Sequence, residues 1–260
     1  IIVRYGPQDD NVWVVSNLAF SGGICYPLKH ANYSVDRAFF GNHPRAPWPE
    51  EDHPKVMHIP FAHVRYRLFS RFWNVLMPYW FAHNVVQAQC VLVHAIMGLH
   101  CRKFWEGESG LGNGFPIAIA ISAAPNTGKT WAMTVAMALM GMFKAEPTAG
   151  DATWPALCEL LGLSDGITRF IDDLVNDKKM QQSKNGYNTW VKSAFKRANR
   201  AVTGKTNVKL TSGLCLSANF DPWCGTEQQD DVFTSRLLKI EFTVKPLAPE
   251  TLAGRELYSE

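Results

Sequence analysis

Apolar runs of strand length alternate with helical segments over the second half of the chain. The run PIAIAIS at 116–122 is compact and apolar, as in the buried middle of a parallel sheet. Strong helix formers follow at 131–143, in the segment WAMTVAMALMGMF. Further strands are expected at 166–172, 207–219 and 236–244, with helices between the first two of these. This alternation predicts an α/β fold with a mainly parallel sheet.

The first half of the chain has a different pattern. Residues 61–105 have a helical composition interrupted once, at Pro78, and predict one or two long helices. Residues 1–60 mix short strand-like runs with a stretch rich in proline, histidine and charge. We therefore divide the chain into an N-terminal segment of unclear fold, which could be the end of a further domain, at 1–60, a helical segment at 61–108, a core at 109–248 and a C-terminal tail at 249–260.

Composition narrows the class of protein only a little. The 260 residues, 47% of them hydrophobic, can bury one sizeable core. The formal charge of +3 is too mild to indicate a nucleic-acid partner by itself. The six cysteines form no CxxC motif, and the sequence has neither a secretion signal nor an apolar run long enough for a membrane span. We expect free thiols, no membrane partner and an intracellular location, cytoplasmic or nuclear.

The decapeptide SAAPNTGKTW, at 122–131, joins the first expected core strand to its helix. Its GKT triplet is typical of a phosphate loop, in which backbone N–H groups and a lysine bind phosphate and a hydroxyl binds Mg²⁺. Gly128 lets the backbone approach the phosphates, and Lys129 and Thr130 supply the cation and the hydroxyl. The predicted nucleotide-binding residues are Ala124, Pro125, Asn126, Thr127, Gly128, Lys129 and Thr130.

Ala123 departs from the glycine with which such loops usually begin. If the position requires a positive φ, alanine costs about 1 kcal/mol, whereas at the end of a strand it costs almost nothing. A chance GKT in an ordinary strand–turn–helix is the alternative, so the prediction depends on other features of the chain.

Three polar features follow the loop in an order that suits ATP hydrolysis. Asp172 and Asp173 end the strand expected at 166–172, where the first carboxylate can serve Mg²⁺ and the second the attacking water. Asn219 ends the next strand, and its amide can both donate and accept at the γ-phosphate. Arg236 precedes the last strand and can reach a neighbouring subunit's γ-phosphate. The alternatives are a solvated acidic turn, a turn-starting asparagine and a surface arginine.

The chain resembles the superfamily 3 helicases of viruses and plasmids and the primase-helicases of mobile elements, which are AAA+ P-loop ATPases. The resemblance lies in four stretches that occur in this order: APNTGKT, FIDD, FKRANRAVTGKTNVKLTSGLCLSANFDP and SRLLKIEF. The resemblance covers roughly residues 115–245. It implies a three-layer core, ATP and Mg²⁺ as cofactors, and translocation on single-stranded DNA or RNA by a homo-oligomeric ring, usually a hexamer. It also implies Lys129 and Thr130 as Walker A residues, Asp172 and Asp173 as Walker B residues, Asn219 as the sensor and Arg236 as the finger.

Basic residues between the acidic pair and Asn219 are the expected contacts to nucleic acid. Lys192, Lys196 and Arg200 are spaced by four and would line one face of a helix. The next segment, TGKTN, has the composition of a hairpin tip, and in the resembled family a hairpin here grips the phosphate backbone, which makes Lys205 the tip residue. Such contacts are salt-dependent and weakly sequence-selective. A solvated surface helix is the alternative.

Other functions remain open from the sequence. A switch or protein-remodelling ATPase would have the same nucleotide site but no stimulation by nucleic acid, and a non-catalytic structural derivative would bind no ATP. Zinc at His83, Cys90, His94 and Cys101 is disfavoured, because a helix would spread these side chains over roughly 27 Å. We expect these four residues to pack in the core.

Overall fold

The computed structural model describes the helical segment, most of the core, and short N-terminal strands. Side chains are described within 68–101, 104, 114–140, 146–162, 167–176, 187–196, 210, 212–222 and 235–243, and strands near the N-terminus and at 199–200 and 208–209 are described by their backbone.

The core contains a five-stranded sheet in which every strand is parallel to its neighbours. Its order is β13-β7-β12-β9-β8, so β7, the strand that enters the phosphate loop, lies inside the sheet between β13 and β12. Because parallel strands end at one edge, the loops after β7, β9 and β12 meet there. The strands are β7 (Ile117–Ile121), β8 (Thr148–Ala149), β9 (Arg169–Asp172), β12 (Leu214–Ala218) and β13 (Leu237–Glu241).

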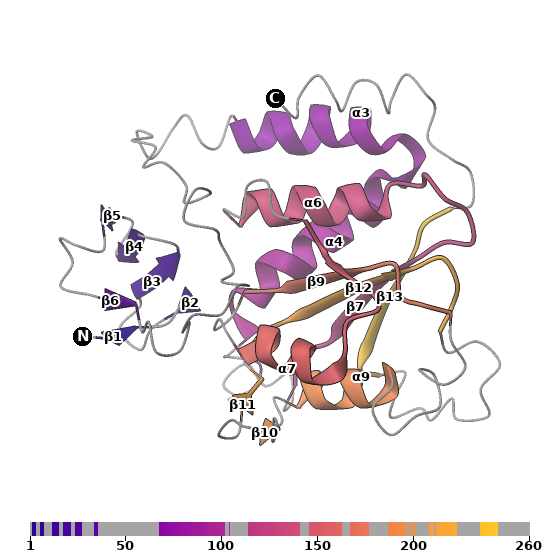
Figure 1. The fold of residues 1–260 in the computed structure, drawn as a ribbon. Coiled ribbons are helices and arrows are strands. Elements are labelled where there is room, and N and C mark those ends of the chain that lie inside the picture. The colour runs from indigo at the N-terminus through magenta and orange to yellow at the C-terminus, as the bar shows by residue number, and fades with distance from the viewer. Residues whose placement is uncertain are drawn as a thin grey trace.

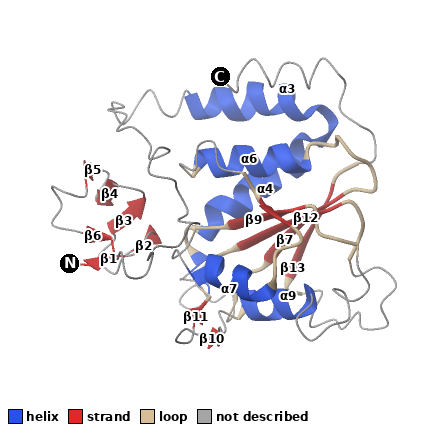
Figure 2. Cartoon of the chain, viewed as in Figure 1, coloured by secondary structure: helices blue, strands red, loops and turns tan. Residues whose placement is uncertain are grey.

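Helices cover both faces of this sheet (Figures 1 and 2). On one face α4 (Val85–Gly98) and α6 (Lys129–Leu139) pack against small β7 side chains such as Ala118. On the other face α7 (Trp154–Gly162) and α9 (Tyr187–Phe195) pack against larger β7 side chains such as Ile119. This alternation along one buried strand produces a three-layer α/β fold of the P-loop NTPase type, as the sequence predicts.

The expected helical segment is broken later than predicted. Pro78 does not interrupt it, because a π-helical turn, η3 (Phe72–Leu76), precedes α3 (Met77–Phe81) and changes the hydrogen-bond register before the proline. The break comes at the 3₁₀ turn η4 (Ala82–Asn84), where Ala82 has φ 45° and ψ −118°. This strained turn separates α3 from α4.

Several short helices and strands were not predicted from the sequence. Neither β8, with two residues, nor α7 was predicted. Near the N-terminus, further strands form a parallel pair and a four-stranded antiparallel sheet separate from the core sheet, and only some of them fall within the strand-like runs IIVRY and VWVVSNLAF. They are β1 (Ile2–Val3), β2 (Gly6–Pro7), β3 (Val12–Val15), β4 (Leu18–Ser21), β5 (Ile24–Pro27) and β6 (Ser34–Val35). None of the helices in the described ranges has the length and apolar character to cross a membrane.

Candidate nucleotide-binding site

The loop between β7 and α6 opens onto a cavity of about 420 Å³ at the carboxyl edge of the sheet. Gly128, the N-cap residue of α6, has φ 98°, and Asn126 has φ 56°. The first backbone N–H groups of α6 have no partner within the helix, so the end of the helix favours an anion. The cavity is lined by Pro125, Asn126, Thr127, Gly128, Lys129, Thr130, Trp131, Thr134, Asp173 and Asn219.

Ala123 does not need the backbone freedom of glycine. Among the residues that the structure describes, positive φ occurs at Ala82, Asn126, Gly128 and Asp173, and Ala123 is not one of them. The next residue, Ala124, donates its N–H to Ser122 Oγ over 3.3 Å, which fixes the start of the loop. Of the two possibilities that the sequence leaves open, alanine therefore occupies the position that costs almost nothing.

Lys129 is buried in the loop, with its side chain directed at polar atoms. Its Nζ donates to Asn219 Oδ1 over 3.0 Å, and at longer range to Thr127 Oγ1 (3.4 Å) and Ala124 O (3.5 Å). Burial lowers the pKa of Lys129 from its usual value, and the nearby carboxylates of Asp172 and Asp173 act in the opposite direction.

The two aspartates have different partners. Asp173 Oδ1 accepts a hydrogen bond from Asn219 Nδ2 over 2.6 Å and lies on the cavity wall, whereas Asp172 is not among the cavity-lining residues. Asp172 Oδ1 instead accepts from Ser217 Oγ, which also accepts from the backbone N–H of Asp173 over 3.1 Å. One serine thus fixes the carboxylate of the first aspartate and the backbone of the second.

Sequence reasoning missed two residues that shape the acidic pair. Ser217 is fully buried in β12, and a polar residue two positions before Asn219, hence on the same side of the strand, is the signal that could have identified it. Gly150 follows β8, and a Cβ there would lie 2.3 Å from Asp173 O. No sequence pattern marks this second contact, because β8 has only two residues.

The donor set at this edge fits Mg²⁺. The Thr130 hydroxyl and the carboxylates of Asp172 and Asp173 are the hard oxygen ligands that this ion prefers. The acidic pair also leaves an excess of negative charge after Lys129 is counted, which favours a cation beside the bound phosphates. Within the described residues, the side chains predicted for ATP and Mg²⁺ therefore gather at one edge of the sheet.

Arg236 lies at the other end of the sheet. In β13 the next residue, Leu237, pairs with Ile117 at the start of β7, whereas Glu241 pairs with Ile121 beside the phosphate loop. The five residues of β13 span about 16 Å. The Arg236 guanidinium instead lies over the Phe195 ring, 5.5 Å from its centroid. Arg236 is thus remote from the nucleotide site of its own chain.

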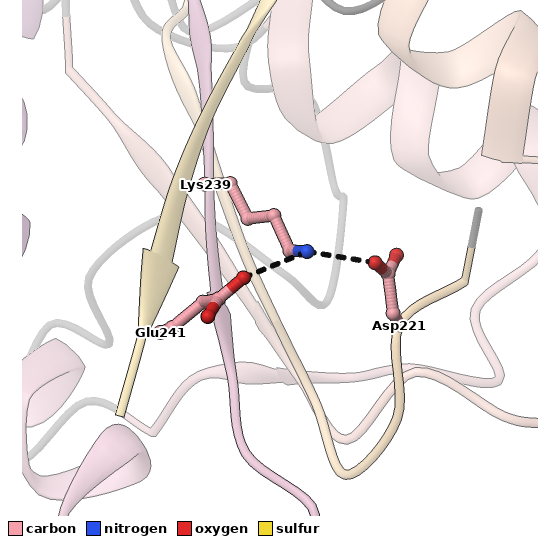
Figure 3. Close-up of polar contacts among 3 residues, drawn as sticks. All are labelled: Asp221, Lys239 and Glu241. Atoms are coloured by element: carbon pink, nitrogen blue, oxygen red, sulfur yellow. Dashed lines mark ion pairs between the residues drawn. The ribbon is translucent and has the colours of Figure 1, made fainter. Parts of the chain in front are cut away.

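The turn that follows Asn219 is tied to β13 by an ion-pair cluster (Figure 3). Lys239 Nζ lies 2.9 Å from Asp221 and 2.8 Å from Glu241. Hydrogen bonds to Asp221 and then to Glu241 raise the pKa of Lys239 to about 12. Since Lys239 and Glu241 are exposed, the cluster contributes at most about 1 kcal/mol, but it connects the turn after Asn219 to β13 across β7.

The predicted basic stripe is wrong in its third member. Lys192 and Lys196 are exposed on or just after α9, but that helix ends at Phe195 and Arg200 lies in a strand. β10 (Asn199–Arg200) pairs antiparallel with β11 (Val208–Lys209), and strand pairing there replaces another helical turn. The antiparallel pairing of β10 with β11 agrees with the strands of the expected hairpin, while the expected tip, including Lys205, lies outside the described residues.

The four residues weighed as zinc ligands have different environments. His83 and Cys90 are exposed, whereas His94 and Cys101 are buried. The His94 ring packs beside Phe115, with ring centroids 5.0 Å apart, and its Nε2 lies 2.8 Å from the Pro116 carbonyl oxygen, to which the neutral ring donates. Burial lowers its pKa to about 4. The prediction of core packing is therefore correct for His94 and Cys101 and wrong for His83 and Cys90.

Comparisons with known proteins support the fold and do not identify a function. No protein-family model and no curated protein matches the chain. Among solved structures, the active helicase Cch of SCCmec type IV aligns with a TM-score of 0.61 and 14% identity, over 98% of this chain and 43% of the helicase. The chain thus spans less than half of that protein. The C-terminal region of NrS-1 aligns with a TM-score of 0.41 and 13% identity, over 98% of this chain and 52% of the other, too weakly to support an argument.

Proposed function

We propose that this chain hydrolyses ATP and couples hydrolysis to movement along, or unwinding of, single-stranded nucleic acid in an oligomeric ring. The observation that supports this most strongly is the continuous set of hydrogen bonds from Lys129 through Asn219 to Asp173 at the mouth of the phosphate loop. A structural P-loop fold has no need for a lysine, an amide and a carboxylate converging on one cavity.

In the proposed reaction, the γ-phosphate replaces Asn219 as the partner of Lys129. This frees Asn219 Oδ1, whereas Nδ2 donates one hydrogen to Asp173 and has a second hydrogen for the γ-phosphate or the attacking water. Asp173 accepts a proton from that water as the water attacks the γ-phosphate and the bond to ADP breaks. Thr130 and Asp172 would hold Mg²⁺, Asp172 through its second oxygen or a water, since Ser217 occupies Oδ1. When bound, the ion neutralises charge on the phosphates.

Arg236 would act on a neighbouring subunit, since it lies at the opposite end of β13 from its own phosphate loop. An arginine supplied from a second chain can stabilise the charge that develops on the transferred phosphoryl group. In this proposal, turnover requires assembly, and a dilute monomer would bind ATP without hydrolysing it efficiently.

The proposed nucleic-acid contacts are Lys205 on the β10–β11 hairpin, with Arg200, Lys192 and Lys196 nearby in sequence. The test is ATPase activity with and without single-stranded DNA and RNA over a salt series. We expect stimulation that falls steeply with salt and that Lys205→Ala weakens. ATPase activity without stimulation would favour a protein-remodelling ATPase, and an absence of ATP binding would favour a structural derivative.

A further inference from the structure

Asn84, at the start of α4, uses its side chain in an unexpected way. Asparagine is favoured at the N-cap of a helix because its side chain accepts a hydrogen bond from the first turn. The Asn84 side chain makes no such cap, although it occupies the N-cap position and is fully buried. Its polar atoms are instead directed out of the helix, toward two distant segments of the chain.

Both ends of the Asn84 amide have partners around the nucleotide site. Nδ2 donates to the Thr127 carbonyl oxygen in the phosphate loop over 3.0 Å. Oδ1 accepts from the backbone N–H of Thr243 over 3.0 Å and from its Oγ1 over 3.1 Å, two residues beyond the end of β13. One side chain from the helical segment therefore joins the phosphate loop to the edge strand of the sheet.

The contact with Thr127 has a consequence for phosphate binding. In a trans peptide the C=O and the following N–H point in opposite directions. Because Asn84 holds the Thr127 carbonyl from the protein side, the N–H of Gly128 is turned away from Asn84, and Gly128 lines the cavity. The strained backbone of Ala82, at φ 45°, lies two residues before Asn84 in the turn that presents it.

We propose that Asn84 is a positioning residue that orients the Gly128 N–H toward the phosphate and fixes the loop against the end of β13. This inference rests on the proposed nucleotide site and gives the helical segment a part in it. Since β13 begins directly after Arg236, the contact with Thr243 also joins the phosphate loop to the strand that follows the proposed finger.

The test compares Asn84→Asp with a matched control. Asn84→Asp keeps the acceptor facing Thr243 but replaces the donor to Thr127 by an oxygen. Asn74→Asp makes the same change at an exposed asparagine of the helical segment, whose side chain donates to Ser70 Oγ over 3.1 Å. We expect the Kd for MgATP, measured by calorimetry, to rise at least about tenfold in Asn84→Asp and less than about twofold in the control.

Amide hydrogen exchange on the nucleotide-free protein provides a readout independent of ATP. Asn84→Asp should speed exchange in the phosphate loop while leaving Thr243 protected, and Asn84→Ala should speed exchange at both. If the buried variants do not fold, Thr243→Val, at an exposed site, removes one of the two bonds to Oδ1 and should raise the Kd by about threefold.

Two results would overturn the inference. The first is an Asn84→Asp variant whose phosphate loop exchanges at the wild-type rate and whose affinity for MgATP equals that of the wild type. The second is amide exchange that rises evenly over β7, β12 and the loop, because this would indicate a general loss of stability. A wild-type chain that binds no ATP would contradict the proposed function alone, because the exchange pattern still decides whether Asn84 fixes the loop.

Discussion

Lys129 and Asn219 are joined by a 3.0 Å hydrogen bond although they lie 90 positions apart in the sequence. One residue begins α6 and the other follows β12, and the parallel sheet brings them together because β7 and β12 are adjacent. The amide of Asn219 also donates to Asp173, so this residue connects the cation of the site to the carboxylate assigned to the water.

Asn219→Ala should therefore impair turnover more than binding. The variant removes the donor expected at the γ-phosphate or the water, and leaves Lys129 and the loop backbone to bind ATP. We expect kcat to fall by about 10²-fold, as for the loss of one donor to a transition state, with a Kd for MgATP within about threefold of wild type. Steady-state kinetics with calorimetry measures both, and a large rise in Kd with an unchanged kcat would contradict the sensor role.

Ala123→Gly should leave ATP affinity unchanged within about twofold, because this position does not have positive φ. Gly128→Ala is the matched opposite change. At φ 98° a Cβ strains the backbone by about 1–2 kcal/mol, so we expect weaker MgATP binding by about tenfold or more. Calorimetric titration of both variants is the measurement. Tighter binding by Ala123→Gly would mean that the alanine does impair the loop.

Gly150→Ala should slow hydrolysis from outside the cavity. The added Cβ would lie 2.3 Å from Asp173 O and 2.6 Å from Leu174 N, which forces the backbone of the acidic turn to move. We expect kcat to fall at least about tenfold, with a loss of stability of about 1–3 kcal/mol. Thermal unfolding and ATPase assays on the same preparation separate the two effects. An unchanged kcat would show that the position of Asp173 is not critical.

His94 should make stability depend on pH below neutrality. Its pKa is about 4 in the folded chain, and its usual pKa is 6.5. Between pH 6.5 and pH 4 the unfolded chain therefore binds a proton that the folded chain does not bind. The free energy of unfolding should fall by about 3 kcal/mol in total as the pH drops from about 6.5 to about 4. Below about pH 4, His94 should cause no further loss of stability.

His94→Gln is the control for this pH dependence. It preserves a donor near the Pro116 carbonyl oxygen but does not titrate. Denaturant unfolding at several pH values should give a flatter profile for the variant than for wild type. Parallel profiles for the two proteins would assign the dependence to other groups.

Much of the candidate site could be predicted because its residues follow apolar strands. Parallel strands end at one edge, so polar residues directly after them converge, which is why Asp173 and Asn219 meet as the sequence suggests. Asn84 could not be found this way. It precedes Thr127 of the phosphate loop by 43 positions, and its contacts depend on how a helix packs against the sheet.

The errors come from patterns that two structures share. A spacing of four between lysine and arginine is the same whether the helix continues or ends, and only pairing with β11 shows that Arg200 is in a strand. Pro78 predicts a break, but a preceding π turn accommodates it. In both cases the local sequence is compatible with two backbone conformations. A tertiary contact or a change of hydrogen-bond register selects one of them.

In the proposed function, Lys129 acts on ATP in the cavity at the start of α6. Its most direct test is MgATP hydrolysis by the assembled wild-type chain and by Lys129→Ala, with circular dichroism to show that both fold. We expect hydrolysis by the wild type and a loss of at least about 10²-fold in the variant. Hydrolysis that survives the substitution at the wild-type rate would contradict it.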